Sequence, residues 1–220
     1  MAGESHLGPA VSTNLSTGMI FVAEWILNHL ELDCVDAGAA WDIQQAFQET
    51  VLSVCSGQHL DLSVELPDLP TCWQIAEAKS GSAYALACYV GTRVATHLTD
   101  RLACMENFGR HLGTIVQISD DIADMERDRS KYHQNQLSPF ANAYLAQISV
   151  LGGFESKDHL KGDAVKPILE NSLVLYMRLE ALKYAELAKG ELKRLALTAE
   201  PRDQILAILK HYSFMGANLN

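Results

Sequence analysis

Apolar residues recur three and four positions apart along most of this chain, which is the spacing of one face of an α-helix. The first such stretch covers about residues 15–31, with Ser12, Thr13 and Asn14 available as N-caps. The same periodicity predicts further helices over about residues 37–60, 71–98, 100–125, 138–150, 163–197 and 202–216. No segment alternates apolar and polar residues as a half-buried strand would. The pattern therefore predicts an all-α fold, in one domain over residues 1–220.

Capping and helix-breaking residues predict where several of these helices begin or weaken. Asp36 and Asp68 precede helical stretches and can cap them, and Pro70 suits a first helical turn. Thr99 can cap the next helix in the same way. We expect an interruption of the helix over 71–98 at Lys79-Ser80-Gly81, where a glycine weakens it.

The largest and smallest side chains in these helices indicate how they pack. Gly109 and Gly113 lie four positions apart and permit a second helix to approach closely. Trp25, Trp41 and Trp73 are interpreted as core residues, because tryptophan is highly buried on average.

Charge and composition exclude some functions. The 220 residues carry a formal net charge of −10, and 48% of them are hydrophobic, which is typical of a globular, core-forming protein. No stretch is dense in Lys or Arg, so we expect no nucleic-acid-binding surface. A polyanionic ligand would be repelled by this charge unless divalent cations lay between it and the protein.

Cysteine usage and the lack of targeting signals predict a cytoplasmic protein. The five cysteines, at positions 34, 55, 72, 88 and 104, form no CxxC pair and no zinc-like cluster with histidine. We interpret them as buried thiols in a reducing compartment. Residues 1–10 do not resemble a signal peptide, and the apolar runs are interrupted too early to predict a membrane-spanning helix.

The sharpest chemical motif is the DDxxD formed by Asp120, Asp121 and Asp124, at the end of an apolar helical stretch. On a helix, Asp120 and Asp124 lie one turn apart on one face, with Gln117 on the same side. Such carboxylates repel each other unless a cation joins them, and oxygen ligands suit Mg²⁺, which substrate phosphates often complete. Considered alone, the motif is equally compatible with a solvated acidic helix end.

Two shorter motifs lie near breaks in other predicted helices. Gln58 and Asp61, three positions apart, share a helix face. Lys79 and Ser80 place a cation beside a hydroxyl, a combination that can hold a phosphate oxygen. Each of these motifs, considered alone, is better explained as an ordinary helix end or a surface lysine.

Taken in order, these motifs resemble the trans-polyprenyl diphosphate synthases, the family of farnesyl and geranylgeranyl diphosphate synthases. The matching segments are GQxxDL at 57–62, the Lys-Ser pair at 79–80 and FGxxLGxxxQxxDDxxD at 108–124. Gly8-Pro9 is similar to the end of the family's RRGxP segment, and the resemblance continues to the last helices. It implies an isoprenoid-synthase-type helical bundle around a central cavity. It also implies a Mg²⁺-dependent prenyl transferase that ionises an allylic diphosphate and is usually dimeric.

The resemblance implies roles for individual residues. The implied metal ligands are the carboxylates that match the second aspartate-rich motif of the family: Asp120, Asp121 and Asp124. The implied substrate-binding residues are the other polar side chains of the three motifs, with one lysine beyond them: Gln58, Asp61, Lys79, Ser80, Gln117 and Lys131. Of these side chains, Lys79, Gln117 and Asp120 are implied to take part in catalysis.

The chain departs from the family pattern at its start. The family's first DDxxD and its paired arginines precede the Gly-Pro segment, and nothing before Gly8 matches them. Asp33 and Asp36 follow that segment and are interpreted as loop and cap residues. We expect either a chain that lacks the N-terminal helices or a shortened relative. In both cases we expect weak or no chain elongation by this chain alone.

Three functions remain open at this point. The first is an enzyme that ionises an allylic isoprenoid diphosphate for attack by isopentenyl diphosphate or another acceptor. The second is a non-catalytic subunit that pairs with an active homologue, so that the protein forms a homodimer or a heterodimer. The third is an acidic helical interaction module in which the DDxxD is incidental.

Overall fold

The computed structural model describes residues 8–30, 36–65, 67–127, 139–151 and 166–214. These residues form helices with short connections and contain no strand, which confirms the all-α prediction. The elements, in chain order, are α1 (Pro9–Leu27), α2 (Ala37–Ser63), α3 (Leu69–Ala76), the π-helical turn η2 (Glu77–Gly81), α4 (Ser82–Ala95), α5 (Thr99–Arg127), α7 (Pro139–Leu151), α8 (Lys166–Arg194) and α9 (Ala199–Phe214).

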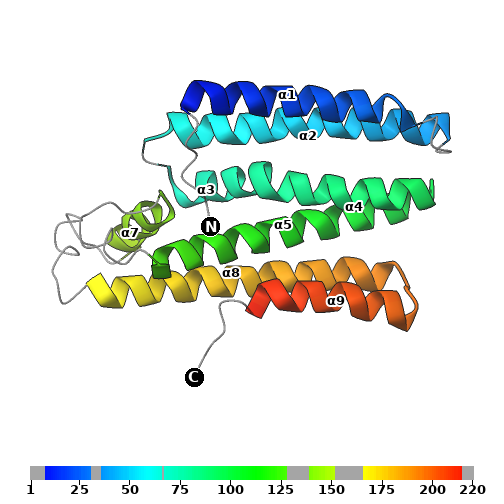
Figure 1. Ribbon diagram of the computed structural model, residues 1–220. Helices are drawn as coiled ribbons and strands as arrows, with labels where there is room; N and C mark the ends of the chain where they lie inside the picture. Colours follow the sequence, from blue (N-terminus) through cyan, green and yellow to red (C-terminus); the bar gives the residue numbers. More distant parts are fainter. Residues whose placement is uncertain (1–7, 31–35, 66, 128–138, 152–165, 215–220) are drawn as a thin grey trace.

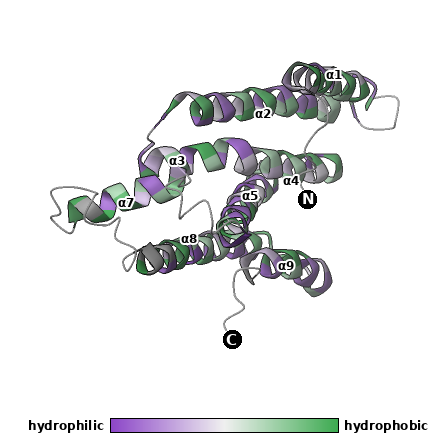
Figure 2. Cartoon of the chain, turned by 60° about the vertical axis from the view of Figure 1, so that its left-hand side comes forward, coloured by the Kyte–Doolittle hydropathy of each residue, from purple (hydrophilic) through white to green (hydrophobic). Residues whose placement is uncertain are grey.

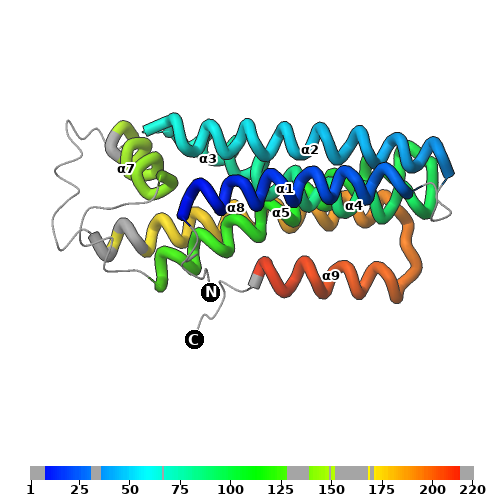
Figure 3. The backbone as a smooth tube through the Cα atoms, turned by 45° about the horizontal axis from the view of Figure 1, so that its top comes forward, coloured from blue at the N-terminus to red at the C-terminus, as the bar shows by residue number. Residues whose placement is uncertain are grey.

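The long helices lie side by side in successive layers (Figure 1). α2 packs against η2 and α4, α4 packs against α5, and α5 packs against α8 and α9. α1 lies along α2 at one edge of the molecule, and α8 and α9 lie at the opposite edge (Figure 2). The short helix α7 packs against α3 and α8, at one end of the long helices (Figure 3).

Two of the predicted helix starts are confirmed by side-chain caps. The Asp36 carboxylate accepts a hydrogen bond from the N–H of Ala39 at 2.9 Å, where α2 begins. The Asp68 carboxylate accepts one from the N–H of Thr71, also at 2.9 Å, where α3 begins. Each bond satisfies one backbone donor that the first helical turn leaves free.

Two other predicted helix starts were placed too late. α1 begins at Pro9, ahead of the proposed caps at 12–14, because the fixed φ of proline suits the first helical turn and its missing N–H costs nothing there. α5 already includes Thr99. The carbonyl of Leu98 accepts the hydrogen bond from the N–H of Leu102, so Leu98, not Thr99, is the residue that precedes the helix.

The main hydrophobic core lies where α5 meets α8 and includes Phe108, Ile115 and Met177. On the opposite side of α5, Gly109 and Gly113 contact α4 and η2. A Cβ at Gly109 would overlap the carbonyl oxygen of Tyr84, and a Cβ at Gly113 would overlap the carbonyl oxygen of Ser80. The predicted close approach at these two glycines is therefore confirmed.

The edge formed by α1 differs from the sequence interpretation. α1 buries none of its residues, and Trp25 and Trp41 are 64% and 61% exposed, so the assignment of these two tryptophans to the core is wrong. Trp73 does pack against the core. By length and mean hydropathy, 1.2 over its most apolar window, α1 could cross a membrane, contrary to our expectation. Core helices and signal sequences pass the same test.

The cysteines follow the sequence interpretation only in part. Cys72 and Cys104 are buried and Cys88 is half-buried, but Cys55 is exposed. All four are free thiols, whereas Cys34 lies outside the described residues.

Candidate functional site

The candidate site is built on η2, where the sequence predicted an interruption of the helix. The helical path continues through the interruption, but with an extra residue in the turn: the N–H of Ser82 donates to the carbonyl of Glu77, five residues earlier. Such π-helical turns are rare and are frequent at functional sites. In this turn, the consecutive residues Lys79 and Ser80 contact two different helices.

Lys79 reaches α2. Its Nζ lies 2.7 Å from Oδ2 of Asp61, and both side chains are 30% exposed. The two helices are close at this point because of Gly57, where a Cβ would lie 2.8 Å from the Cβ of Ala78. The partial exposure leaves the ammonium group of Lys79 accessible to a ligand while Asp61 orients it.

Ser80 reaches α5. Its hydroxyl donates to Oε1 of Gln117 at 2.6 Å, and Nε2 of Gln117 donates to Oδ1 of Asp121 at 3.0 Å. Hydrogen bonds therefore link η2 to the aspartate-rich motif through one glutamine. Gln117 was expected beside Asp120, but in the structure it is bonded to Asp121, one full turn further along the same face.

Beside this network lies a cavity of about 250 Å³. Its polar part consists of Asp61, Lys79, Gln117 and Asp121. Its remaining lining is mainly apolar and comes from α3 and α7: Cys72, Ile75, Ala76, Pro139 and Phe140. A cation, an amide and two carboxylates thus face a largely hydrocarbon wall, an arrangement that suits a ligand with a charged head and an apolar body.

The electrostatics of the cavity centre on Asp121. Burial raises the pKa of its carboxyl from 3.8 to about 6, and the neighbouring carboxylates of Asp124 and Asp120 contribute to the rise. The hydrogen bond from Gln117 and the charge of Lys79 oppose this rise. Keeping Asp121 ionised therefore costs free energy in the absence of a cation, and a bound cation would offset that cost.

The other two aspartates of the motif are exposed to solvent. Asp124 accepts a hydrogen bond from Nη1 of Arg127 at 2.8 Å in a pair that is more than 70% exposed on both sides, so this pair contributes little to stability. Within the described ranges, no three His, Cys, Asp or Glu side chains come close enough to enclose a metal ion by themselves. The all-oxygen donor set fits a Mg²⁺ ion that carboxylates and phosphate oxygens hold jointly.

Of the predicted substrate-binding residues, Ser80 contacts Gln117 but does not line this cavity, and two others do not join it. Gln58 is exposed on α2 and does not line it. The reason is that Gly57 faces η2, which turns its neighbour Gln58 away from the turn. Lys131 lies outside the described residues.

The apolar wall of the cavity was not predicted. Its residues carry no chemical motif, and those of α7 lie far from α3 in the sequence. Cys72 belongs to this wall, and burial, with the nearby charges of Asp68 and Asp121, raises the pKa of its thiol to about 11. Cys72 therefore stays protonated and is not a nucleophile at neutral pH.

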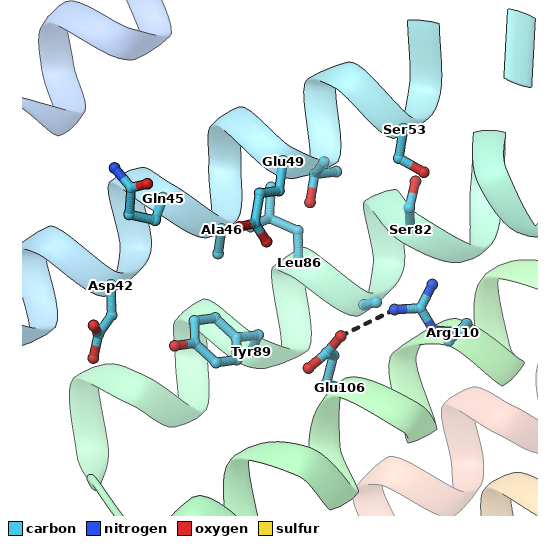
Figure 4. A pocket seen from close by; sticks show the side chains of 12 residues that line it. Asp42, Gln45, Ala46, Glu49, Ser53, Ser82, Leu86, Tyr89, Glu106 and Arg110 are labelled. Atoms are coloured by element: carbon cyan, nitrogen blue, oxygen red, sulfur yellow. Dashed lines mark hydrogen bonds and ion pairs between the residues drawn. The ribbon is translucent and has the colours of Figure 1, made fainter. Parts of the chain in front are cut away.

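A second cavity, of about 390 Å³, lies between α2, α4 and α5 (Figure 4). It shares no lining residue with the first cavity, and none of the predicted site residues lines it. Its lining includes Asp42, Glu49 and Tyr89, and an ion pair between Arg110 and Glu106 at 2.9 Å crosses its lower edge in the view of Figure 4. The smaller cavity is therefore our candidate site.

Similar structures establish the fold. Polyprenyl synthetase from Streptomyces coelicolor A3(2) superposes with a TM-score of 0.70 at 20% identity, over 93% of this chain and 67% of that one. A geranylgeranyl pyrophosphate synthase gives 0.72 at 16% identity, over 90% and 66%. The geranylgeranyl pyrophosphate synthetase of the archaeon Geoglobus acetivorans gives 0.65 at 15% identity, over 81% and 60%. The chain thus spans 60–67% of the length of these three proteins.

Sequence comparison establishes the family. No curated protein gives a significant match to the chain. The sequence model that describes polyprenyl synthetases matches residues 2–139, which is more than half of the chain and includes the GQxxDL, Lys-Ser and DDxxD motifs. The fold, the order of these motifs and this match agree, and the chain belongs to the polyprenyl synthetase family.

Proposed function

We propose that this protein binds an allylic isoprenoid diphosphate through Mg²⁺ and ionises it, for condensation with isopentenyl diphosphate or another acceptor. The observation that carries the proposal is the cavity in which Lys79, Gln117 and Asp121 meet an apolar wall. A diphosphate group would lie at the charged end of this cavity, and the hydrocarbon group would lie against α3 and α7.

Each polar side chain would have a separate task. Lys79 would donate to a phosphate oxygen while it stays bonded to Asp61, because an ammonium group has three donors. Gln117 would hold the Asp121 carboxylate in place. Asp120, Asp121 and Asp124 would hold Mg²⁺, whose charge would stabilise the departing diphosphate. The apolar wall would exclude water from the carbocation.

We further propose that the protein assembles through α1, with a second copy or with a homologue. The large apolar residues of this helix that are more than half exposed are Val11, Leu15, Met19, Phe21, Val22, Trp25 and Ile26. A surface helix normally keeps one polar face, and an apolar patch of this size marks an interaction site. The free thiols support the proposal of a reducing, cytoplasmic location.

A second candidate function is a non-catalytic subunit of a heteromeric synthase. The observation in its favour is that, within the described residues, no three His, Cys, Asp or Glu side chains come close enough to hold a metal ion by themselves. Such a subunit would bind the diphosphate weakly or only together with its partner. It would show no release of diphosphate on its own.

The two functions are separated by a turnover assay. The protein is incubated with geranyl diphosphate, isopentenyl diphosphate and Mg²⁺, and the released pyrophosphate is measured. The enzyme proposal predicts release that stops with EDTA and in Lys79→Ala and Asp121→Asn. Mg²⁺-dependent binding of geranyl diphosphate without release favours the subunit. If a folded protein shows no binding of geranyl diphosphate and no release of pyrophosphate, the proposed diphosphate site is contradicted.

A further inference from the structure

A hydrogen bond joins η2 to a helix that the candidate site does not use. The hydroxyl of Tyr184, on α8, donates to Oε1 of Glu77 at 3.1 Å. Glu77 is the first residue of the π-helical turn, two positions before Lys79. Tyr184 is only 8% exposed. This partly buried hydrogen bond, between residues 107 positions apart, connects the turn directly to α8.

Neighbouring aromatic rings fix the position of the Tyr184 side chain. Its ring lies 5.9 Å from the ring of His111 on α5 and 6.1 Å from that of Trp73 on α3, centroid to centroid. Burial and the nearby charge of Glu77 both raise the pKa of the phenol. The hydroxyl group therefore remains a neutral donor with a fixed direction, aimed at the Glu77 carboxylate.

The π-helical register matters because it decides which way Lys79 and Ser80 point. Removal of the extra residue from the turn would rotate the preceding helix by about 100° relative to the following one. Lys79 could then no longer face Asp61 while Ser80 faces Gln117. π-helical turns are rare and occur mostly as single turns inside α-helices, so this register is not the default of the chain. An anchor outside the turn is therefore needed to hold this register.

We infer that Tyr184 and Glu77 are positioning residues whose hydrogen bond holds η2 in the π-helical register that directs Lys79 into the candidate site and Ser80 toward Gln117. The effect on ligand affinity rests on the proposed diphosphate-binding function. The effect on the turn itself does not. Neither residue lines the cavity, so both would act through the turn and not by contact with the ligand.

The chain offers a matched control in Tyr176. This tyrosine also lies on α8, its hydroxyl accepts a hydrogen bond from Nε1 of Trp73 at 3.1 Å, and its ring lies 6.3 Å from that of Trp73. It belongs to the same aromatic cluster as Tyr184 but makes no bond to η2. Tyr176→Phe therefore removes a comparable hydroxyl without releasing the turn.

The experiment compares Tyr184→Phe, Glu77→Ala, Glu77→Gln and Tyr176→Phe with the unmodified protein. One measurement is the affinity for inorganic pyrophosphate at fixed Mg²⁺. The other is hydrogen exchange at the N–H of Ser82, which closes the turn on the Glu77 carbonyl. We expect Tyr184→Phe and Glu77→Ala to weaken affinity about tenfold, as loss of a hydrogen bond to a charged group does, and to speed the exchange. Glu77→Gln keeps an acceptor and should largely restore both.

Two results would overturn the inference. One is unchanged affinity and exchange in Tyr184→Phe. The other is an equal change in Tyr176→Phe, which would make the effect one of general packing. If the unmodified protein binds no pyrophosphate, the proposed function fails. The exchange at Ser82 then decides the positioning role by itself, because that measurement needs no ligand.

Discussion

Asp121→Asn removes a charge that the folded protein keeps at a cost. The pKa of this carboxyl is raised from 3.8 to about 6, chiefly by burial. Because the folded-state pKa lies above the unfolded value, the folded protein binds more protons than the unfolded chain between about pH 4 and pH 6. The free energy of unfolding therefore falls as the pH rises through this window, and the penalty is complete above about pH 6.

The size of the effect follows from the shift. A rise of about two pKa units corresponds to ~3 kcal/mol, at about 1.4 kcal/mol per unit. The amide oxygen that the substitution introduces can still accept the hydrogen bond from Gln117. We therefore expect the substitution to stabilise the protein by about 1–3 kcal/mol at pH 8, or roughly 2–10 °C in Tm, and to have little effect at pH 4.

The assay is thermal unfolding of the unmodified protein and of Asp121→Asn, without metal or ligand, at pH 4 and pH 8. Asp120→Asn is the matched control, because it removes the same charge from an exposed neighbour. Its Tm should change by less than that of Asp121→Asn at pH 8. A lower Tm for Asp121→Asn at pH 8, or an equal gain at both pH values, would refute the reasoning.

Three further predictions concern packing, ligand binding and assembly. Gly113→Ala should destabilise the protein by about 3 kcal/mol or more in denaturant unfolding, because the new Cβ would overlap the Ser80 carbonyl. The control Gly91→Ala has open space around its Cβ and should be neutral or stabilising by up to about 1 kcal/mol, so equal effects of the two substitutions would contradict the packing. Lys79→Met should weaken Mg²⁺-dependent pyrophosphate affinity about tenfold in calorimetry, and unchanged affinity would remove Lys79 from the site. Val22→Glu should abolish assembly in sedimentation equilibrium. It should leave the Tm of the monomer nearly unchanged, because no residue of α1 is buried in the monomer. A dimer that persists would place the interface elsewhere.

The helices could be predicted from the sequence because their signals are local. Apolar spacing, and the caps Asp36 and Asp68, lie within a few residues of the turns that they stabilise. The environment of Trp25 could not be predicted in this way, because it depends on which helices lie beyond α1. Residue type alone gave a core assignment that the structure contradicts.

The candidate site could likewise be predicted from the sequence only in part. The aspartate-rich motif and the Lys79-Ser80 pair could be found because their spacing resembles a family pattern. The ion pair between Lys79 and Asp61, and the hydrogen bond from Tyr184 to Glu77, join residues 18 and 107 positions apart and leave no local signal. The π-helical turn was detected only as a weak point in a helix, because its extra residue is fixed by contacts with neighbouring layers.

The most direct test of the central claim is thermal unfolding with and without geranyl diphosphate at fixed Mg²⁺, repeated with EDTA and in Asp120→Ala. A ligand that binds only the folded state must raise Tm. At a ligand concentration one hundred times Kd, it adds about 2.7 kcal/mol to the free energy of unfolding. The proposed function predicts a rise that requires Mg²⁺ and is lost in Asp120→Ala. An unchanged Tm with geranyl diphosphate and Mg²⁺, in a protein shown to be folded, would contradict a free-standing diphosphate site at the aspartate-rich motif.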